Sequence, residues 1–212
     1  MNATTNTEKR KNVKSATNVR TLVQIAMLAA VATVLMLVEF PLPFIAPPFY
    51  EMDFSEVPVL VGAFAMGPVA GIAIEAIKIL LNFVINGTIT AGVGELANFI
   101  FGCAFLLPAA LIYRSNKTRK NAIIGMAVGT VVMTVAACIM NALVLLPAYG
   151  AAFGMPVDAF VQMGTSINKA IDSLFTFAVL AVGPFNLIKG IAVSVVVLLI
   201  YKRIRVILKG DL

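Results

Sequence analysis

Histidine and tryptophan are absent from this chain of 212 residues, cysteine occurs twice, and only 12% of the residues are charged. Without histidine, the chain has no imidazole to act as a general base, a proton relay or a metal ligand. A Gly-rich loop of the Walker type is also absent, so ATP hydrolysis by that route is excluded. No pairing of a nucleophile with a base is visible. We therefore expect neither an enzyme nor a metal site.

Hydrophobic residues make up 60% of the chain, whereas soluble domains are about half apolar and about a quarter charged. Several runs of about 20 apolar residues are long enough to span a membrane as helices. Cys103 and Cys138 both lie inside such runs. Buried membrane cysteines serve as small apolar side chains, and a disulfide framework is not indicated. The composition therefore predicts an integral membrane protein.

The apolar runs predict an all-α integral membrane protein with six transmembrane helices, at about 21–40, 57–67, 69–85, 93–113, 121–147 and 184–205. The first run is too long for a cleaved signal peptide and is read as a retained helix. The second is too short to cross about 30 Å of hydrocarbon unaided. Four prolines in "PLPFIAPPFYEMDFSE" predict an irregular outer loop. Residues 148–182 are expected to be partly amphipathic, with 174–183 as a re-entrant or interfacial piece.

The basic residues fall into three clusters that flank apolar runs, within residues 9–20, 114–120 and 202–209. Cytoplasmic loops carry an excess of Lys and Arg, so both termini and the middle cluster are assigned to the cytoplasm. This predicts a basic segment over 1–20, a six-helix membrane domain over 21–205 and a tail over 206–212. The net charge of +6 could also suit nucleic acid, but the positions of the clusters favour a lipid bilayer instead.

Ionisable side chains inside a membrane-spanning run are costly and are candidate functional groups by default. Together with the amides beside them, they are Glu39, Glu75, Lys78, Glu95, Lys189, Asn82, Asn98, Asn141 and Asn186. Glu75 and Lys78 share a helix face with Asn82, either as an internal i, i+3 pair or as part of a ligand site. Glu95 and Asn98 also share a face, and the glycines of "GVGELANF" permit a close approach that favours a nearby ligand.

Asn141, Asn186 and Lys189 form the most distinctive set. The assigned orientation puts all three in the outer halves of the last two helices, at a similar depth. Asparagines can also bond helix to helix, but Lys189 has no acid three or four residues away on its own helix. It therefore needs a partner from another segment or from a bound molecule. Amides and an ammonium between apolar walls suit a flat heteroaromatic ligand with imide-like edges.

Ala26 and Ala30 in the first helix are small residues four positions apart. Such spacing permits close helix packing in lipid, although alanine is common in this chain. This face would suit docking onto another membrane subunit.

Four motifs together resemble those of a known family: "EFPLPFIAPPFYEMDFSEVPVLVGAFAMGPVAGI", "GVGELANF", "LLPAYG" and "PFNLIKG". Over about residues 20–205 the chain resembles the riboflavin-specific substrate-binding (S) components of energy-coupling factor (ECF) transporters. The resemblance implies a six-helix protein of the bacterial cell membrane that captures riboflavin at the outer face. It also implies association with a transmembrane coupling protein and two ATPases. The flavin is then cargo and not a redox cofactor.

The resemblance also implies roles for individual residues. Asn141, Asn186 and Lys189 would hydrogen-bond the isoalloxazine ring. The first outer loop would cover the site with Glu39, Leu42, Pro43 and Phe44. Glu95 and Asn98 would lie near the ribityl chain, and Ala26 and Ala30 would contact the coupling protein.

Other readings of the sequence stay open. One is a self-contained secondary transporter, although no inverted repeat is evident, or an S component for another small heteroaromatic vitamin. A membrane enzyme or assembly scaffold is another, although no catalytic cluster is recognisable. Among flavins, we expect the unphosphorylated vitamin to bind better than the mononucleotide, because only Lys169 and Lys189 are available outside to meet a phosphate.

Overall fold

The computed structural model describes residues 3–88 and 90–209, with side chains for 19–88, 90–200 and 203. The helices are α1 (Ala3–Met36), α2 (Glu56–Met66), α3 (Pro68–Asn86), α4 (Val93–Ser115), α5 (Arg119–Met140), α6 (Leu146–Phe153), α7 (Val157–Ile167), α8 (Leu174–Phe177) and α9 (Gly183–Lys209). Two π-helical segments, η1 (Asn141–Leu145) and η2 (Ala178–Val182), join α5 to α6 and α8 to α9. The ends of the predicted terminal segments, 1–2 and 210–212, lie outside the described residues, as do the side chains of most of their basic residues.

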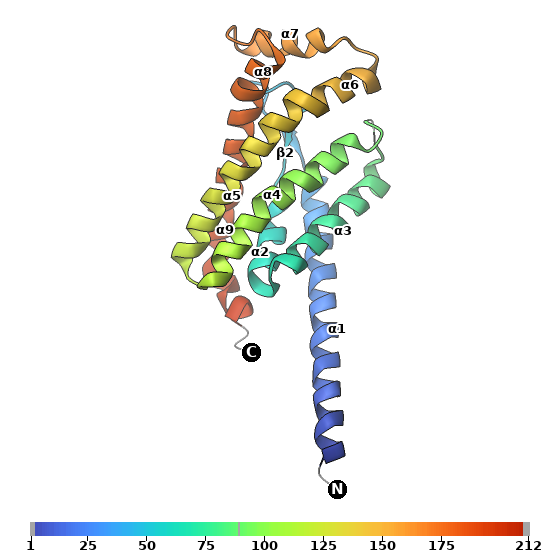
Figure 1. The fold of residues 1–212 in the computed structure, drawn as a ribbon, viewed down its shortest axis with the longest axis vertical. Coiled ribbons are helices and arrows are strands. Elements are labelled where there is room, and N and C mark those ends of the chain that lie inside the picture. Colours follow the sequence, from blue (N-terminus) through green and yellow to red (C-terminus); the bar gives the residue numbers. More distant parts are fainter. Residues whose placement is uncertain (1–2, 89, 210–212) are drawn as a thin grey trace.

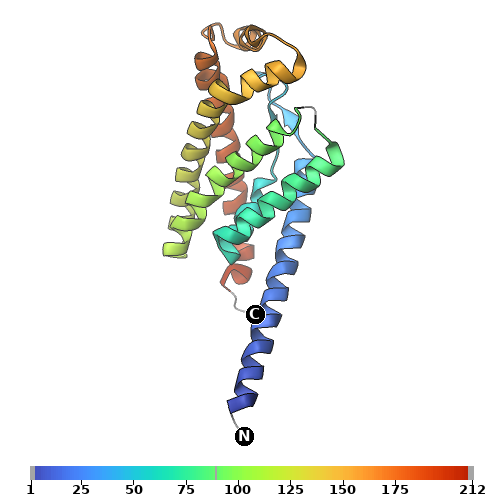
Figure 2. The same cartoon turned by 45° about the vertical axis from the view of Figure 1, so that its right-hand side comes forward.

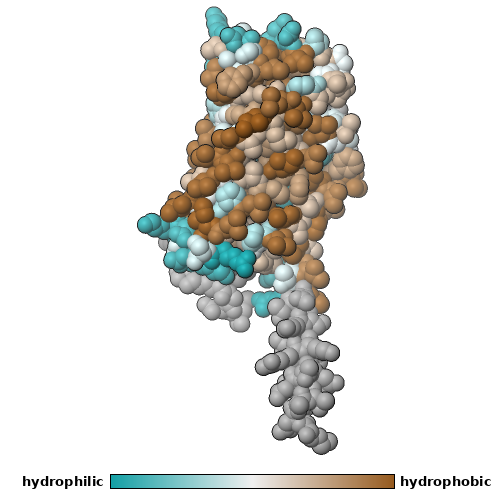
Figure 3. All heavy atoms as spheres, in the orientation of Figure 1, coloured by the Kyte–Doolittle hydropathy of each residue, from teal (hydrophilic) through white to brown (hydrophobic). Residues whose placement is uncertain are grey.

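Five helical stretches of the described chain are long and apolar enough to cross a membrane: Val19–Met36, Pro68–Asn86, Val93–Ser115, Arg119–Phe153 and Leu174–Ile200. α2 has 11 residues, which corresponds to about 17 Å, so the predicted shortness of the second run is confirmed. On the face seen in Figure 3, a broad hydrophobic band separates hydrophilic groups at the two ends. The protein is therefore an all-α membrane protein with five long apolar helices and one short one.

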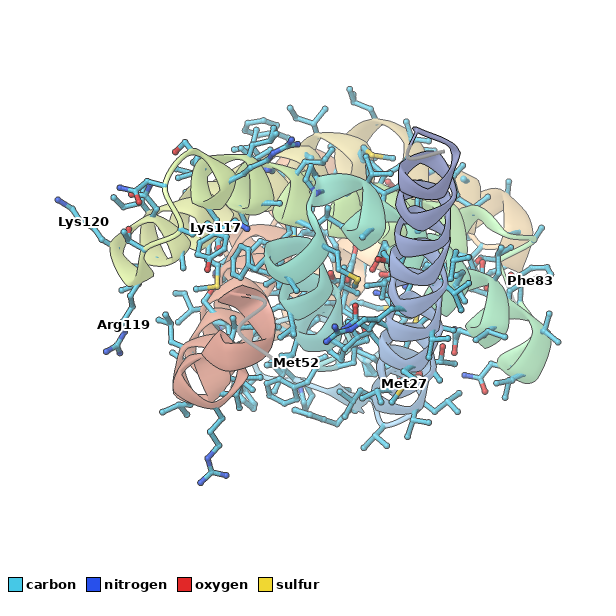
Figure 4. All side chains as sticks on the ribbon, turned by 90° about the horizontal axis from the view of Figure 1, so that it is seen from below. Met27, Met52, Phe83, Lys117, Arg119 and Lys120 are labelled. Atoms are coloured by element: carbon cyan, nitrogen blue, oxygen red, sulfur yellow. The ribbon has the colours of Figure 1, made fainter. Side chains whose placement is uncertain are left out.

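Both ends of the described chain lie at the same end of the bundle (Figures 1 and 2). α6, α7 and α8 lie at the opposite end. Figure 4, seen from below, shows Lys117, Arg119 and Lys120 together at the turn between α4 and α5. Basic side chains therefore gather at the end where the chain begins and finishes.

The first helix ends earlier than the sequence suggested. α1 stops at Met36, so Glu39 lies beyond the helix and not within it. The loop that follows is not wholly irregular, because β1 (Phe40–Pro41) pairs antiparallel with β2 (Glu51–Met52). Prolines lack the N–H that a helix needs, but they are tolerated in short edge strands. The two strands draw the ends of the loop together above the bundle.

The last two long helices also differ from the prediction. The sequence suggested that one helix closes near 147 and that 174–183 is separate from the final helix. Instead, apolar helical stretches run continuously over Arg119–Phe153 and Leu174–Ile200. Each carries a π-helical segment that ends two residues before a proline, Pro147 or Pro184. A widened turn accommodates the missing N–H and the bulky ring, so neither proline ends its helix.

The core of the bundle depends on close contact between α4 and α5. A Cβ added at Gly129 would lie 2.3 Å from the Phe105 carbonyl oxygen, and one at Gly125 would lie 2.7 Å from that of Ala109. Glycines at this spacing let two helix backbones approach closely, which is the main source of packing energy between helices in lipid. Both helices contribute side chains to the lining of one cavity.

Candidate ligand-binding cavity

A cavity of about 340 Å³ lies toward the end of the bundle where the β1–β2 loop crosses it. Its walls come from this loop, the end of α3, the turn between α3 and α4, and the helices α4, η1, α6 and α9. Seven of the residues singled out from the sequence line it: Glu39, Asn82, Glu95, Asn98, Asn141, Asn186 and Lys189. Segments far apart in the chain therefore bring their polar groups to one hollow.

Asn141 is buried at the start of η1, with 1% of its surface exposed. Its amide donates to the Ala137 carbonyl at 2.9 Å and its oxygen accepts from the Tyr50 hydroxyl at 2.5 Å. One N–H and one lone pair of this amide are still free to meet a ligand, because a side-chain amide has two of each. Tyr50 itself lines the cavity from the loop, so it connects the loop to the helical wall.

Asn186 lies one turn beyond η2 and is 6% exposed. Its amide donates to the Val182 carbonyl, the last residue of η2, at 2.9 Å. The π-helical segments thus stand directly beside both asparagines of the cavity. Widened turns of this kind occur frequently at functional sites.

Lys189 has a protein partner that its own helix does not supply. Its Nζ lies 2.7 Å from Oδ2 of Asp53, in the loop before α2. The sequence left two kinds of partner open, another segment or a bound molecule, and the structure shows a partner from another segment. Burial alone would raise the pKa of Asp53, but the ammonium groups of Lys189 and Lys78 lower it to about 2. The Asp53 carboxylate is therefore ionised at neutral pH and orients the Lys189 side chain at the cavity wall.

The part of the cavity lining that comes from the loop is acidic. Glu39 directly precedes β1 and Glu51 is the first residue of β2, and both line the cavity together with Asp53. Partial burial of the Glu39 carboxyl raises its pKa to about 7, and the neighbouring carboxyls of Glu51 and Asp53 act in the same direction. Lys189 opposes this shift without reversing it. Glu39 consequently changes its charge near neutral pH.

Glu95 is held by the turn that precedes α4. Its Oε2 accepts from the Thr88 hydroxyl at 3.1 Å and from the Thr90 hydroxyl at 3.4 Å. The carboxylate lies in the first turn of α4, where the positive end of the helix dipole stabilises it. Asn98 lies nearly one turn further along the same helix and is exposed within the cavity wall. Glu95 therefore has a structural role in this turn, in addition to any contact with a ligand.

The structure does not bring every predicted residue to the cavity. Leu42, Pro43 and Phe44 are absent from its lining in the described part of the chain, and Phe44 is 73% exposed. The loop contributes Phe49, Tyr50, Glu51 and Asp53 instead, and the sequence analysis singled out none of these. Their position in the sequence could have indicated a place in the cavity, because they stand at the end of the loop, where the chain returns to the bundle to begin α2.

Glu75 and Lys78 form the internal i, i+3 pair that the sequence suggested as one alternative, with 2.7 Å between Lys78 Nζ and Glu75 Oε2. Glu56 of α2 joins them, also at 2.7 Å from Lys78 Nζ. Glu56 lines the cavity, whereas Glu75 and Lys78 lie behind it. Asn82, on the same helix, does reach the cavity.

Ala26 and Ala30 lie on the exposed side of α1, away from the cavity. Ala29, Ala32, Thr33 and Met36 form the opposite, buried face of the same helix. Cys103 and Cys138 are free thiols. Within the described residues, no group of three or more His, Cys, Asp or Glu side chains could hold a metal ion.

An apolar helical bundle with a polar-lined cavity beneath a loop has the architecture of a membrane subunit that binds a small molecule. Residues 20–201 match the family model described as "ECF transporter, substrate-specific component". The chain belongs to this family of transport proteins, which are not enzymes, and it is a multi-pass membrane protein. The resemblance noted from the motifs is confirmed at the level of the family.

Two curated relatives and one solved structure support this assignment. The chain is 40% identical to the riboflavin transporter RibU of Staphylococcus aureus (strain TCH60), over 89% of this chain and 92% of the relative. It is 37% identical to the riboflavin transporter FmnP of Bacillus subtilis (strain 168), over 88% and 93%. A solved structure of the S component of a bacterial ECF transporter is 38% identical, with a TM-score of 0.71 and coverage of 89% and 96%.

Proposed function

We propose that this chain captures riboflavin in the cavity and delivers it together with an ECF energising module. The observation that carries the proposal is the cavity itself, whose volume of about 340 Å³ falls within the range of about 300–1,000 Å³ typical of small-molecule pockets. Its lining combines two buried amides and an ammonium with the aromatic rings of Tyr50 and Phe185. Both relatives named above are riboflavin transporters.

In this proposal, the polar edge of the isoalloxazine ring meets Asn141, Asn186 and Lys189. That edge carries carbonyl acceptors and an imide N–H, which complement the free amide groups and the ammonium. The ring faces would lie against the aromatic side chains of the lining, where the Tyr50 ring centroid lies 4.7 Å from that of Phe49 and 5.7 Å from that of Phe185. Aromatic surfaces favour a flat ring over a free ion.

The remaining contacts follow from the same orientation. Glu95 and Asn98 would accept and donate to the hydroxyl groups of the ribityl chain. Glu39, Leu42, Pro43 and Phe44 would cover the bound vitamin when the loop closes over it, although three of these residues lie off the cavity in the arrangement described above. Closure would exclude water from the ring and strengthen its hydrogen bonds.

We infer six membrane crossings with both termini in the cytoplasm. α2 is too short to cross alone, so the second crossing would consist of α2 together with the extended chain before it. An even number of crossings agrees with the two ends of the chain at one end of the bundle (Figure 1). The basic residues near that end agree with a cytoplasmic location, and the cavity would then open to the outer face.

Delivery of the vitamin would require a transmembrane coupling protein and two ATPases, since no nucleotide-binding motif occurs in this chain. The coupling protein would dock on the exposed face of α1 that contains Ala26 and Ala30. Small residues at this spacing allow a partner helix to approach closely in lipid.

The absorbance spectrum of the detergent-purified protein tests the proposal directly. Flavin bands corresponding to about one ligand per chain, or saturable quenching of added riboflavin fluorescence at one site, are expected. A folded preparation that neither retains nor binds riboflavin would refute the proposal. Riboflavin transport by the protein alone in vesicles would favour a secondary transporter.

A further inference from the structure

Three ionisable side chains are buried where α2 and α3 meet, and one of them, Glu56, borders the cavity. Glu56 is 5% exposed, Glu75 is 0% exposed and Lys78 is 1% exposed. The Lys78 ammonium contacts three oxygens: Glu56 Oε1 at 2.7 Å, Glu75 Oε2 at 2.7 Å and the Ser55 hydroxyl at 3.2 Å. The contacts with Glu56 and Ser55 are hydrogen bonds, and the contact with Glu75 is an ion pair. We call these three ionisable residues the buried cluster.

The buried cluster contains one more acid than base. If both carboxyls were ionised, a net charge of −1 would remain in a region shielded from water, which is strongly unfavourable. The next charged groups do not remove it, because Asp53 is neutralised by Lys189 in an ion pair of 2.7 Å. The neighbouring titratable group on α4 is the thiol of Cys103, which ionises less readily than a carboxyl. α1 contributes the neutral hydroxyl of Thr33 to its buried face.

Three carboxyl oxygens of the buried cluster lack a hydrogen-bond partner and are inaccessible to solvent: Glu56 Oε2, Glu75 Oε1 and Glu75 Oε2. Of these, Glu75 Oε2 lies within ion-pair distance of Lys78. Glu75 Oε1 lies so close to α4 that a Cβ at Gly102 would be 2.3 Å from it. Buried acceptors without partners are rare in native proteins, so each of them requires a physical explanation.

A proton satisfies this arrangement better than a metal cation. A cation such as Ca²⁺ requires six to eight oxygen ligands, whereas the buried cluster offers three carboxyl oxygens without a hydrogen bond, and one of these already contacts Lys78. Lys78 would also repel it at close range. A single proton removes the surplus charge, converts one carboxylate into a hydrogen-bond donor and needs no additional space.

We propose that the buried cluster of Glu56, Lys78 and Glu75 is a proton-binding site, which holds one proton on its two carboxyl groups at neutral pH. The site is joined to the ligand cavity by a continuous chain of contacts. Lys78 donates to the Ser55 hydroxyl at 3.2 Å, the Ser55 backbone N–H donates to Asp53 at 2.7 Å, and Asp53 pairs with Lys189 in the cavity wall. Loss of the proton would therefore affect the Asp53–Lys189 ion pair in the cavity wall.

Difference infrared spectroscopy of the detergent-purified protein tests the site. The background variant is Glu39→Gln, because Glu39 in the cavity lining also holds a proton near neutral pH. In this background we expect a carbonyl band of a protonated carboxylic acid that exchanges slowly in heavy water. The band should disappear in Glu75→Gln and equally in Glu56→Gln, since one carboxylate then remains and is matched by Lys78.

Thermal unfolding provides an independent measurement. Glu75→Gln mimics the protonated acid and should keep the Tm at pH 7, whereas Lys78→Met leaves both acids without their ammonium and should lower it. The Tm of the background protein should fall in alkaline solution as the second carboxyl ionises, and that of Glu75→Gln should fall less. These experiments need no riboflavin, so their failure is distinct from a failure of the proposed function.

The result that overturns the inference is the absence of the band together with loss of Tm in Glu75→Gln at pH 7. A Tm that depends on Na⁺ or K⁺ at fixed pH, without the band, would replace the proton by a monovalent cation and also overturn it. If Glu75→Gln does not fold, the band in the background protein and its response to Glu56→Gln decide the matter.

Discussion

Lys189 on α9 and Asp53 in the loop before α2 are separated by 136 positions in sequence, yet their charged atoms lie 2.7 Å apart. This ion pair attaches the end of the outer loop to the helix that carries Asn186. It also explains how a lysine is accommodated at membrane depth without a bound ligand, because buried charges are stable when paired. The ion pair therefore connects the loop to the helical wall of the cavity.

Removal of the ammonium should weaken riboflavin binding. Lys189→Met alone would leave Asp53 buried without a partner, so the informative variant is Lys189→Met combined with Asp53→Asn. Hydrogen bonds to charged groups contribute about 1.5–3 kcal/mol, so the dissociation constant should rise about tenfold to a hundredfold. Asp53→Asn alone should have a smaller effect, and the exposed Lys169→Met should have none. Unchanged affinity in the well-folded double variant would remove Lys189 from the site.

The raised pKa of Glu39 predicts that the stability of the loop depends on pH. Its pKa is raised from 4.5 to about 7, so the folded loop favours the protonated form. The contribution to stability is fully present below about pH 4.5 and is lost as the pH rises through 7. The loop should therefore become more sensitive to a protease, and release riboflavin faster, between pH 6 and pH 8. Asp53 acts in the opposite sense, but only near its pKa of about 2.

Two variants separate this effect from general alkaline instability. Glu39→Gln should remove the pH dependence of protease sensitivity, because the amide stays neutral throughout. Glu51→Gln should move the transition to lower pH, since it removes a neighbouring carboxyl that raises the pKa of Glu39. Identical pH profiles for all three proteins would contradict the assignment.

The apolar runs predicted the helices well because membrane burial imposes length and composition on each of them. The sequence also identified Asn141, Asn186 and Lys189, since polar groups are conspicuous against an apolar background. It did not identify Asp53 or Tyr50, because each owes its position to the return of the loop onto helices that are distant in sequence. Periodicity carries no information about such contacts.

The continuity of the last two long helices was missed for a different reason. A proline in an apolar run favours the end of a helix, and the sequence predicted one helix over 121–147 and a separate one over 184–205. The helices continue because a π-helical segment precedes each proline. Local propensity does not reveal whether neighbouring helices will stabilise a widened turn, and this depends on the packed bundle.

Restoring the N–H at position 184 should therefore disturb ligand binding more than folding. Pro184→Ala permits regular α-helical hydrogen bonding, so the π-helical segment η2 is no longer needed. Conversion of η2 to a regular α-helix would rotate Asn186 relative to the cavity. Loss of one neutral hydrogen bond corresponds to about 0.5–1.5 kcal/mol, so the riboflavin affinity should fall about threefold to tenfold with the Tm maintained. Pro108→Ala, at a proline inside α4 that does not line the cavity, is the matched control and should leave the affinity unchanged.

Discrimination against flavin mononucleotide is a further expectation. A phosphate adds about 1.5 to 2 negative charges, and the cavity lining contains Glu39, Glu51 and Glu95, while Lys189 is already paired. Fluorescence titrations should give an affinity for the mononucleotide at least about tenfold below that for riboflavin, which is about 1.4 kcal/mol of repulsion. The difference should narrow at high ionic strength. Equal or tighter binding of the mononucleotide would show that a cationic group outside this set meets the phosphate.

Enlarging the exposed face of α1 should separate ligand binding from assembly. The buried face of α1 uses Ala29, Ala32, Thr33 and Met36 to pack against the bundle, so Ala26→Phe and Ala30→Phe leave that packing and the distant cavity intact. A bulky ring between two helices prevents the close approach on which small-residue packing depends. We therefore expect normal riboflavin affinity together with loss of co-purification with the coupling protein. Val131→Phe, on the exposed face of α5, is the control for added bulk toward lipid. If the coupling protein still co-purifies with the α1 variants, the docking surface must lie on another helix.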